Sequence, residues 1–130
     1  MIYHYKYTYD VGCWGLHVIL IDELNKLHKK LEKDIDIVLH YGVEGNHNPN
    51  GYHPKGMAFD LHFEKLGEVI RMQEMYAFLL EHWQGGIGIY PHWHQPGFHL
   101  DVGPAGRVWY KNAGGEYVGI SEHLEKFINV

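Results

Sequence analysis

Two short segments of the 130-residue chain alternate strictly between apolar and polar side chains. Each segment places an acid and a histidine on its polar side: these are Asp60 and His62 in residues 57–63, and His99 and Asp101 in residues 98–102. A period of two is typical of β-strands, because successive side chains point to opposite faces of the sheet. Both segments are therefore predicted to be strands with one face in the core. If they are neighbours in the sheet, Asp60 and His99 can converge.

The rest of the chain predicts a mixture of helices and strands. Leucines spaced three or four residues apart in residues 16–33 indicate an amphipathic helix, and residues 67–83 indicate a second helix ended by Gly85 and Gly86. Further strands are expected at residues 3–9, 35–39, 87–90 and 108–110, a loop at 42–52, and a last helix from Ser121. The order favours an α+β fold: a small, largely antiparallel sheet with flanking helices, in one domain over residues 1–130.

The composition excludes several classes of protein. The net charge is -5, and the two arginines, Arg71 and Arg107, are far apart, which argues against nucleic acid as a partner. The apolar run at residues 16–21 is far shorter than the ~20 residues of a membrane span. With Cys13 alone, neither an internal disulfide nor a Cys-rich zinc cluster is possible. Twelve histidines are a high number for a chain of 130 residues, and their positions are the most informative feature of the composition.

A third histidine completes a possible metal site. His53 lies seven residues before Asp60, and Gly56 between them permits a sharp turn. Two imidazoles and one carboxylate, with water as the fourth ligand, form the ligand set of hydrolytic zinc sites. We therefore expect His53, Asp60 and His99 to bind a zinc ion. The alternative is that the three are unrelated surface residues.

Residues 53–60, with the sequence His-Pro-Lys-Gly-Met-Ala-Phe-Asp, fit the pattern His-x-x-Gly-x-Ala-x-Asp. This pattern resembles that of the D-alanyl-D-alanine carboxypeptidase and L-alanyl-D-glutamate endopeptidase family, zinc peptidases of bacterial cell walls and phage endolysins that share a fold with the hedgehog signalling domain. Residues 86–91 and 97–103 are similar to the branch whose third ligand lies in an apolar-His-apolar-Asp strand. The resemblance covers residues 35–110 and implies hydrolysis of amide bonds in peptidoglycan stem peptides or cross-bridges. It implies one Zn²⁺ per chain, held by His53, Asp60 and His99.

Two positions near these motifs differ from many relatives. Gly51 stands where many have Ser, and Pro96 stands where many have the carboxylate that acts as general base. Asp101, on the same strand face as the last ligand, is the replacement candidate, either as base or as a group that orients an imidazole. His92 and His94 are candidates for proton transfer or for contact with the oxyanion or the substrate.

Substrate binding is also expected to differ from the family pattern. Residues 39–43 contain no arginine, although many relatives have one there to hold a substrate carboxylate. A carboxypeptidase depends on such a group more than an endopeptidase does. His40 and Lys55 are the candidate substitutes, and Tyr52 and Trp93 are candidates to line a peptide or glycan groove.

Two other functions stay open. Pro96 favours a non-catalytic module of the same fold that contains zinc and binds the cell wall or has a structural role. A metal-dependent hydrolase or cupin with His92 and His94 as primary ligands is also possible, but Gln95 and Pro96 lack the acid that a cupin requires. A phage-type lysin made in the cytoplasm and acting on the wall fits the sequence, and a periplasmic or secreted enzyme with its leader removed fits nearly as well.

Overall fold

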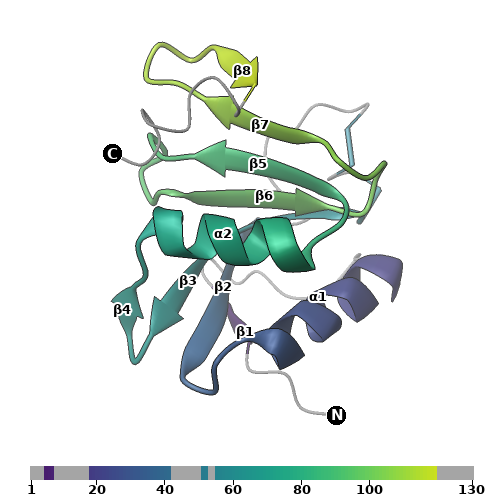
Figure 1. Ribbon diagram of the computed structural model, residues 1–130, viewed down its shortest axis with the longest axis vertical. Coiled ribbons are helices and arrows are strands. Elements are labelled where there is room, and N and C mark those ends of the chain that lie inside the picture. The colour runs from purple at the N-terminus through teal and green to yellow at the C-terminus, as the bar shows by residue number, and fades with distance from the viewer. Residues whose placement is uncertain (1–4, 8–17, 42–50, 53–54, 120–130) are drawn as a thin grey trace.

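The computed structural model describes residues 5–7, 18–41, 51–52 and 55–119 (Figure 1). Its helices are α1 (Val18–Lys30) and α2 (Met72–His82). Its strands are β1 (Tyr5–Tyr7), β2 (Ile35–Tyr41), β3 (Ala58–Lys65), β4 (Glu68–Val69), β5 (Gly86–Tyr90), β6 (Gly97–Asp101), β7 (Val108–Lys111) and β8 (Tyr117–Gly119).

The strands form one sheet in the order β1-β2-β3-β6-β5-β7-β8, and β4 pairs with β3. The pairs β1–β2 and β5–β7 are parallel, and the other five pairs in the described residues are antiparallel. The predicted α+β class with a largely antiparallel sheet is thus confirmed. β3 and β6 are far apart in the sequence but adjacent in the sheet, so the two alternating segments do lie side by side.

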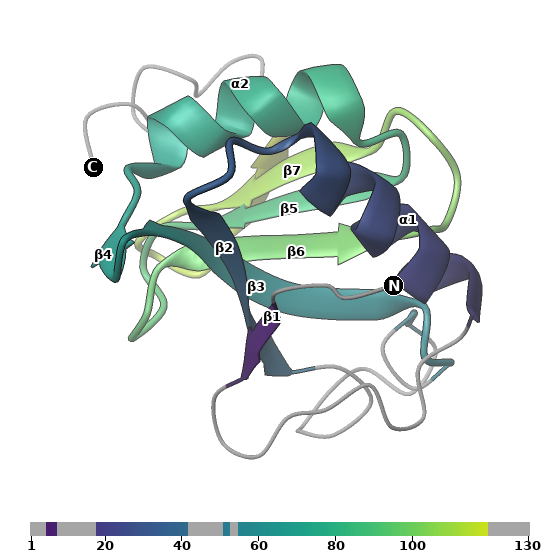
Figure 2. The same ribbon diagram turned by 90° about the horizontal axis from the view of Figure 1, so that it is seen from below.

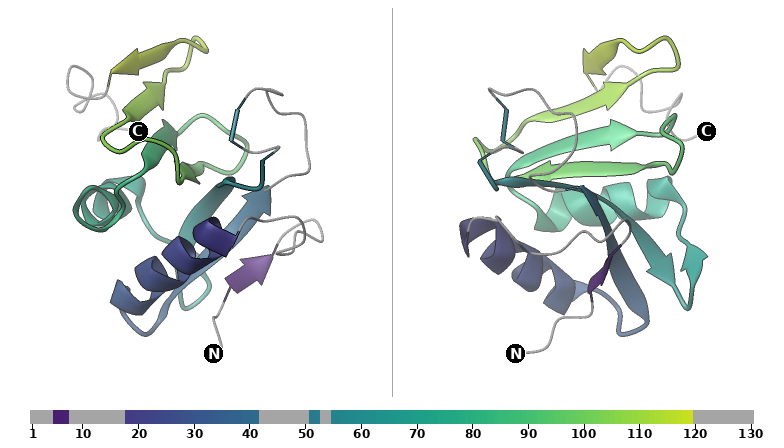
Figure 3. Two further views of the ribbon diagram at one scale, coloured as in Figure 1. Left: turned by 90° about the vertical axis from the view of Figure 1, so that its right-hand side faces the viewer. Right: turned by 180° about the vertical axis from the view of Figure 1, so that it is seen from behind.

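Both helices cover the same face of the sheet. They lie in front of the strands in Figure 1 and behind them in the rear view of Figure 3, and Figure 2 shows α2 above the strands and α1 above β1 and β3. Alternate residues of the strands form one hydrophobic cluster with the helices. Its buried members include Phe59, Leu61, Phe63, Ile87, Ile89, Phe98 and Leu100 from the strands, and Leu20, Leu24, Leu27, Met75 and Leu79 from the helices. Burial of each large side chain contributes about 1.5–3 kcal/mol, which holds β3 and β6 in register.

The predicted start of the second helix is wrong. Residues 67–71 are not helical, because the chain reverses at Leu66 and Gly67, which have φ angles of 52° and 86°. Two successive positive φ angles are the geometry of a two-residue hairpin turn, and β4 then pairs with β3. Ile70 packs against the core from the strand-to-helix connection. An apolar residue at this position therefore reflects packing against the core and does not indicate a helix.

The other predicted elements have different outcomes. α1 confirms the first helix within residues 16–33, and the four other strands predicted within the described residues are present. β8 was not predicted. Residues 3–4, 8–9 and 42–50 and the helix expected from Ser121 lie outside the described residues. In the part of the chain that the structure describes, no helix is long and apolar enough to span a membrane.

The face of the sheet opposite the helices is polar and mostly closed to solvent. Asp60, His62 and Asp101 were expected to point away from the core, and they do, but all three are buried. Buried charged and polar groups require hydrogen bonds or ionic partners to offset their loss of hydration. The contacts of this polar layer therefore define the candidate site.

Candidate functional site

One row of residues crosses four strands on the polar face. Asp60 of β3 is paired with His99 of β6, His99 with Gly88 of β5, and Gly88 with Trp109 of β7. The Nδ1 atom of His99 lies 3.5 Å from Oδ1 of Asp60, and these side chains are 11% and 9% exposed. The sheet register therefore brings together two of the three residues predicted to bind zinc.

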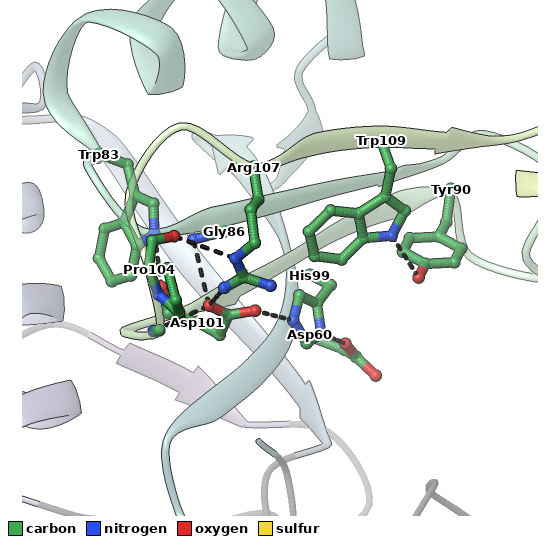
Figure 4. A network of polar contacts seen from close by, with 10 residues as sticks. Asp60, Trp83, Gly86, Tyr90, His99, Asp101, Pro104, Arg107 and Trp109 are labelled. Carbon is green, nitrogen blue, oxygen red and sulfur yellow. Dashed lines mark hydrogen bonds and ion pairs between the residues drawn. The ribbon is translucent and has the colours of Figure 1, made fainter. Parts of the chain in front are cut away.

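Gly88 leaves the space in which this row is packed. A Cβ atom at Gly88 would lie 2.7 Å from ring atoms of both Trp109 and Tyr90. Without it, the Trp109 ring reaches the His99 ring, with 5.2 Å between the ring centroids, and its Nε1 donates to the Tyr90 hydroxyl at 2.9 Å (Figure 4). The indole thus forms one wall beside His99.

Asp101 lies behind His99 and is fully buried. Its Oδ2 is 2.7 Å from Nε2 of His99, and its Oδ1 accepts from the backbone N–H groups of Gly86 at 3.1 Å and Gly103 at 2.9 Å, and from Nη2 of Arg107 (Figure 4). Burial alone would raise the pKa of Asp101. The hydrogen bond and charge of His99, the Gly103 N–H and the Arg107 charge together hold that pKa below its usual value.

The ionised state of Asp101 determines the orientation of His99. A carboxylate only accepts, so Nε2 of His99 donates to Asp101 and Nδ1 faces Asp60. Burial by itself would lower the pKa of His99, but its hydrogen bonds and charge interactions with Asp101 and Asp60 raise it. A divalent ion at Nδ1 would compete with the proton for that nitrogen.

The described part of this donor set fits a zinc ion. Two ligands of a tetrahedral ion, each about 2.0–2.2 Å from the metal, lie about 3.4 Å apart, close to the 3.5 Å between His99 Nδ1 and Asp60 Oδ1. A carboxylate that accepts from the distal nitrogen of a ligating histidine, as Asp101 does, is the usual support of such ligands. His53, the third predicted ligand, lies outside the described residues. Within the described ranges no group of three His, Cys, Asp or Glu residues could hold a metal ion.

Tyr52 and Lys55 lie on the Arg107 side of the site. The Arg107 guanidinium is 5.1 Å from the centre of the Tyr52 ring, and the Lys55 ammonium is 5.5 Å from it. Tyr52 is partly buried and Lys55 is exposed. These two predicted substrate-binding residues are therefore connected to Asp101 through Arg107.

His92 and Trp93, two of the predicted residues of the 92–94 segment, lie at another depression. A cavity of about 180 Å³ is lined by residues that include Tyr90, His92, Trp93 and Lys111. Trp93 stacks on Tyr90, with ring centroids 4.1 Å apart and planes 9° apart. His92 and His94 are exposed. Tyr90 connects this depression to Trp109 and so to the row that contains His99.

His40 was predicted to bind substrate, but the structure buries its side chain. Its Nε2 lies 2.5 Å from Nδ1 of His62, whose Nε2 lies 2.7 Å from a carboxylate oxygen of Glu64. Burial and the neighbouring His62 lower the pKa of His40 to about 4, although the charges of Asp60 and Glu64 act in the opposite direction. His40 is thus neutral near pH 7 and favours a structural role in the polar layer.

Sequence reasoning did not assign a role to Arg107, Trp109 or Glu64. Arg107 and Trp109 are two residues apart at the start of β7, so a period-two pattern places both on the polar face. That spacing was a usable signal for the pair. Glu64 likewise continues the polar alternation of Asp60 in β3.

Comparisons with protein-family models, curated proteins and solved structures found no match to this chain.

Proposed function

We propose that the chain is a zinc-dependent metallopeptidase that hydrolyses amide bonds in peptidoglycan stem peptides or cross-bridges. The observation that carries this proposal is the Asp60–His99 pair, with Asp101 hydrogen-bonded behind the imidazole. The sequence motifs at residues 53–60 and 97–103 support the same activity and the hedgehog-like version of the α+β fold.

The residues of the site have separate roles in this proposal. His53, Asp60 and His99 would hold one Zn²⁺, and the ion would supply Lewis-acid activation of a water molecule and of the scissile carbonyl. Asp101 Oδ2 accepts from His99 Nε2 and keeps Nδ1 directed toward Asp60. Since the Asp101 carboxylate accepts from four donors, it acts as a positioning residue and is a poor candidate for the general base. His92 and His94, which are exposed, remain the candidates for proton transfer.

Elemental analysis and a muropeptide digest test the proposal together. We expect one zinc per chain and new amino termini that disappear with a chelator and return with Zn²⁺. His99→Ala and Asp60→Ala should lose both zinc and hydrolysis, whereas His82→Ala, at the end of α2 on the opposite side of the sheet, should keep both. Hydrolysis that persists at full rate in His99→Ala, or in the chelated protein, would refute the assignment.

Two observations favour the non-catalytic alternative. Pro96 replaces the usual acid, and Asp101 is occupied by the four donors described above. A zinc-containing module of this kind would co-sediment with peptidoglycan and release no new amino termini. The same digest, with bound protein measured in the pellet, separates the two functions.

A further inference from the structure

Arg107 presents a guanidinium beside the Asp60–His99 pair, and its side chain is 36% exposed. Its Nε donates to the carbonyl of Pro104 at 3.0 Å, and its Nη2 donates to Asp101. A guanidinium has five N–H donors in a planar fork, so these two bonds use only part of its capacity. The exposed edge can therefore donate to a ligand while Arg107 remains anchored to the site.

Aromatic rings fix the position of this guanidinium. It lies 5.1 Å from the centre of the Tyr52 ring and 5.7 Å from the centre of the Trp109 ring. A Cβ atom at Gly103 would lie within 2.6 Å of both Nη2 and the Tyr52 hydroxyl, so a side chain there would break this packing. A guanidinium held in advance of binding loses less conformational entropy when it binds an anion.

The local charges favour an anionic ligand. Arg107 and Lys55 balance the carboxylates of Asp60 and Asp101, and a divalent ion at the Asp60–His99 pair would make the group positive. We propose that Arg107 forms a subsite that binds a carboxylate of the substrate, a proposal that rests on the proposed peptidase function. The planar fork pairs with a carboxylate through two parallel hydrogen bonds.

A substrate carboxylate can come from two sources. It is either the α-carboxylate at the end of a peptide, which a carboxypeptidase would recognise, or the side-chain carboxylate of an internal residue, which an endopeptidase would recognise. The four probes are N-acetyl-D-alanyl-D-alanine, its C-terminal amide, the C-terminal amide of N-acetyl-L-alanyl-D-glutamate, whose single carboxylate is that of the side chain, and the corresponding compound with both carboxyl groups amidated. Each acid is compared with its matched amide, and the pair with the larger preference for the acid shows which of the two carboxylates Arg107 binds.

Equilibrium binding to the zinc-loaded protein, followed by tryptophan fluorescence or calorimetry, measures the subsite, and the chelated protein provides the same measurement without hydrolysis. We expect one acid to bind about ten- to hundredfold more tightly than its matched amide, the range of a charged hydrogen-bonded pair. Arg107→Gln should abolish this preference. Arg71→Gln removes the other arginine, which is exposed at the start of α2, and should retain it. An acid preference that survives in Arg107→Gln would overturn the proposal.

A second variant separates ligand binding from support of Asp101. Arg107→Lys keeps the positive charge without the fork, and it should fold, bind zinc like the unmodified protein and retain only part of the acid preference. Full retention of the preference by Arg107→Lys, or no preference in the unmodified protein, would overturn the proposal. If the unmodified protein shows zinc-dependent hydrolysis but no acid preference, the subsite alone is refuted. If the unmodified protein shows the acid preference but neither binds zinc nor hydrolyses peptidoglycan, the proposed function alone is refuted.

Discussion

His40 should make the stability of the folded protein fall steeply in mild acid. Its side chain is 7% exposed, and its lowered pKa of about 4 compares with 6.5 for an ordinary histidine. Burial is the main cause, and the adjacent His62 adds to it. The imidazole must therefore be neutral in the folded protein over a pH range in which the unfolded chain binds a proton.

The sign and size of the effect follow from linkage. Between pH 6.5 and about 4 the unfolded state binds more protons at His40, so the free energy of unfolding decreases as the pH falls. The contribution of neutral His40 to the free energy of unfolding is fully present above pH 6.5 and fully lost below about pH 4. At about 1.4 kcal/mol per pKa unit, it amounts to about 3 kcal/mol, a large part of the 5–15 kcal/mol typical of a folded domain.

Urea unfolding of the chelated protein at several pH values between 7 and 4.5, followed by tryptophan fluorescence, measures this contribution. His40→Gln should lose stability at pH 7, because its contact with His62 changes, but should have a flatter pH dependence than the unmodified protein. His82→Gln, which alters a half-buried histidine on α2, controls for the loss of one imidazole. Parallel curves for His40→Gln and the unmodified protein would refute the reasoning.

Three further substitutions test the packing and the support of the site. Gly88→Ala should lower the free energy of unfolding by about 1–3 kcal/mol, measured by urea denaturation, because its methyl group would overlap Trp109; an unchanged value would contradict the close packing. Asp101→Asn should weaken zinc binding about 10- to 100-fold in a competition titration, and unaltered affinity would argue against its positioning role. Leu66→Asn should raise the melting temperature, because leucine is strained at a φ of 52° where asparagine is tolerated, and a lower temperature would contradict the turn assignment.

The pairing of Asp60 with His99 was accessible to sequence reasoning because it follows from periodicity. An alternating segment fixes which residues share a face, and the apolar residues on the other face identify the core side. The start of α2 was not accessible in this way. Leu66 adopts a positive φ that its type does not favour, so the hairpin to β4 depends on tertiary pairing with β3.

The positions of Arg107 and His40 depend on contacts between distant segments. Arg107 reaches Asp101 only because β7 is placed beside β5 by a parallel pairing, which local sequence does not encode. The register of β2 against β3 shifts between Leu39 and Tyr41, at the position of His40. Such irregularities cannot be derived from a strict period of two.

Because Asp60 is paired directly with His99, insertions and deletions within these two strands would disrupt the site. One residue inserted or deleted next to Asp60 would move its carboxylate to the helix-covered face and bring a core side chain to the polar face. Changes of two residues would preserve the face but slide the carboxylate past the imidazole. Length variation in descendants of this sequence should therefore accumulate in the turns, such as residues 112–116, and leave β3 and β6 unchanged in length.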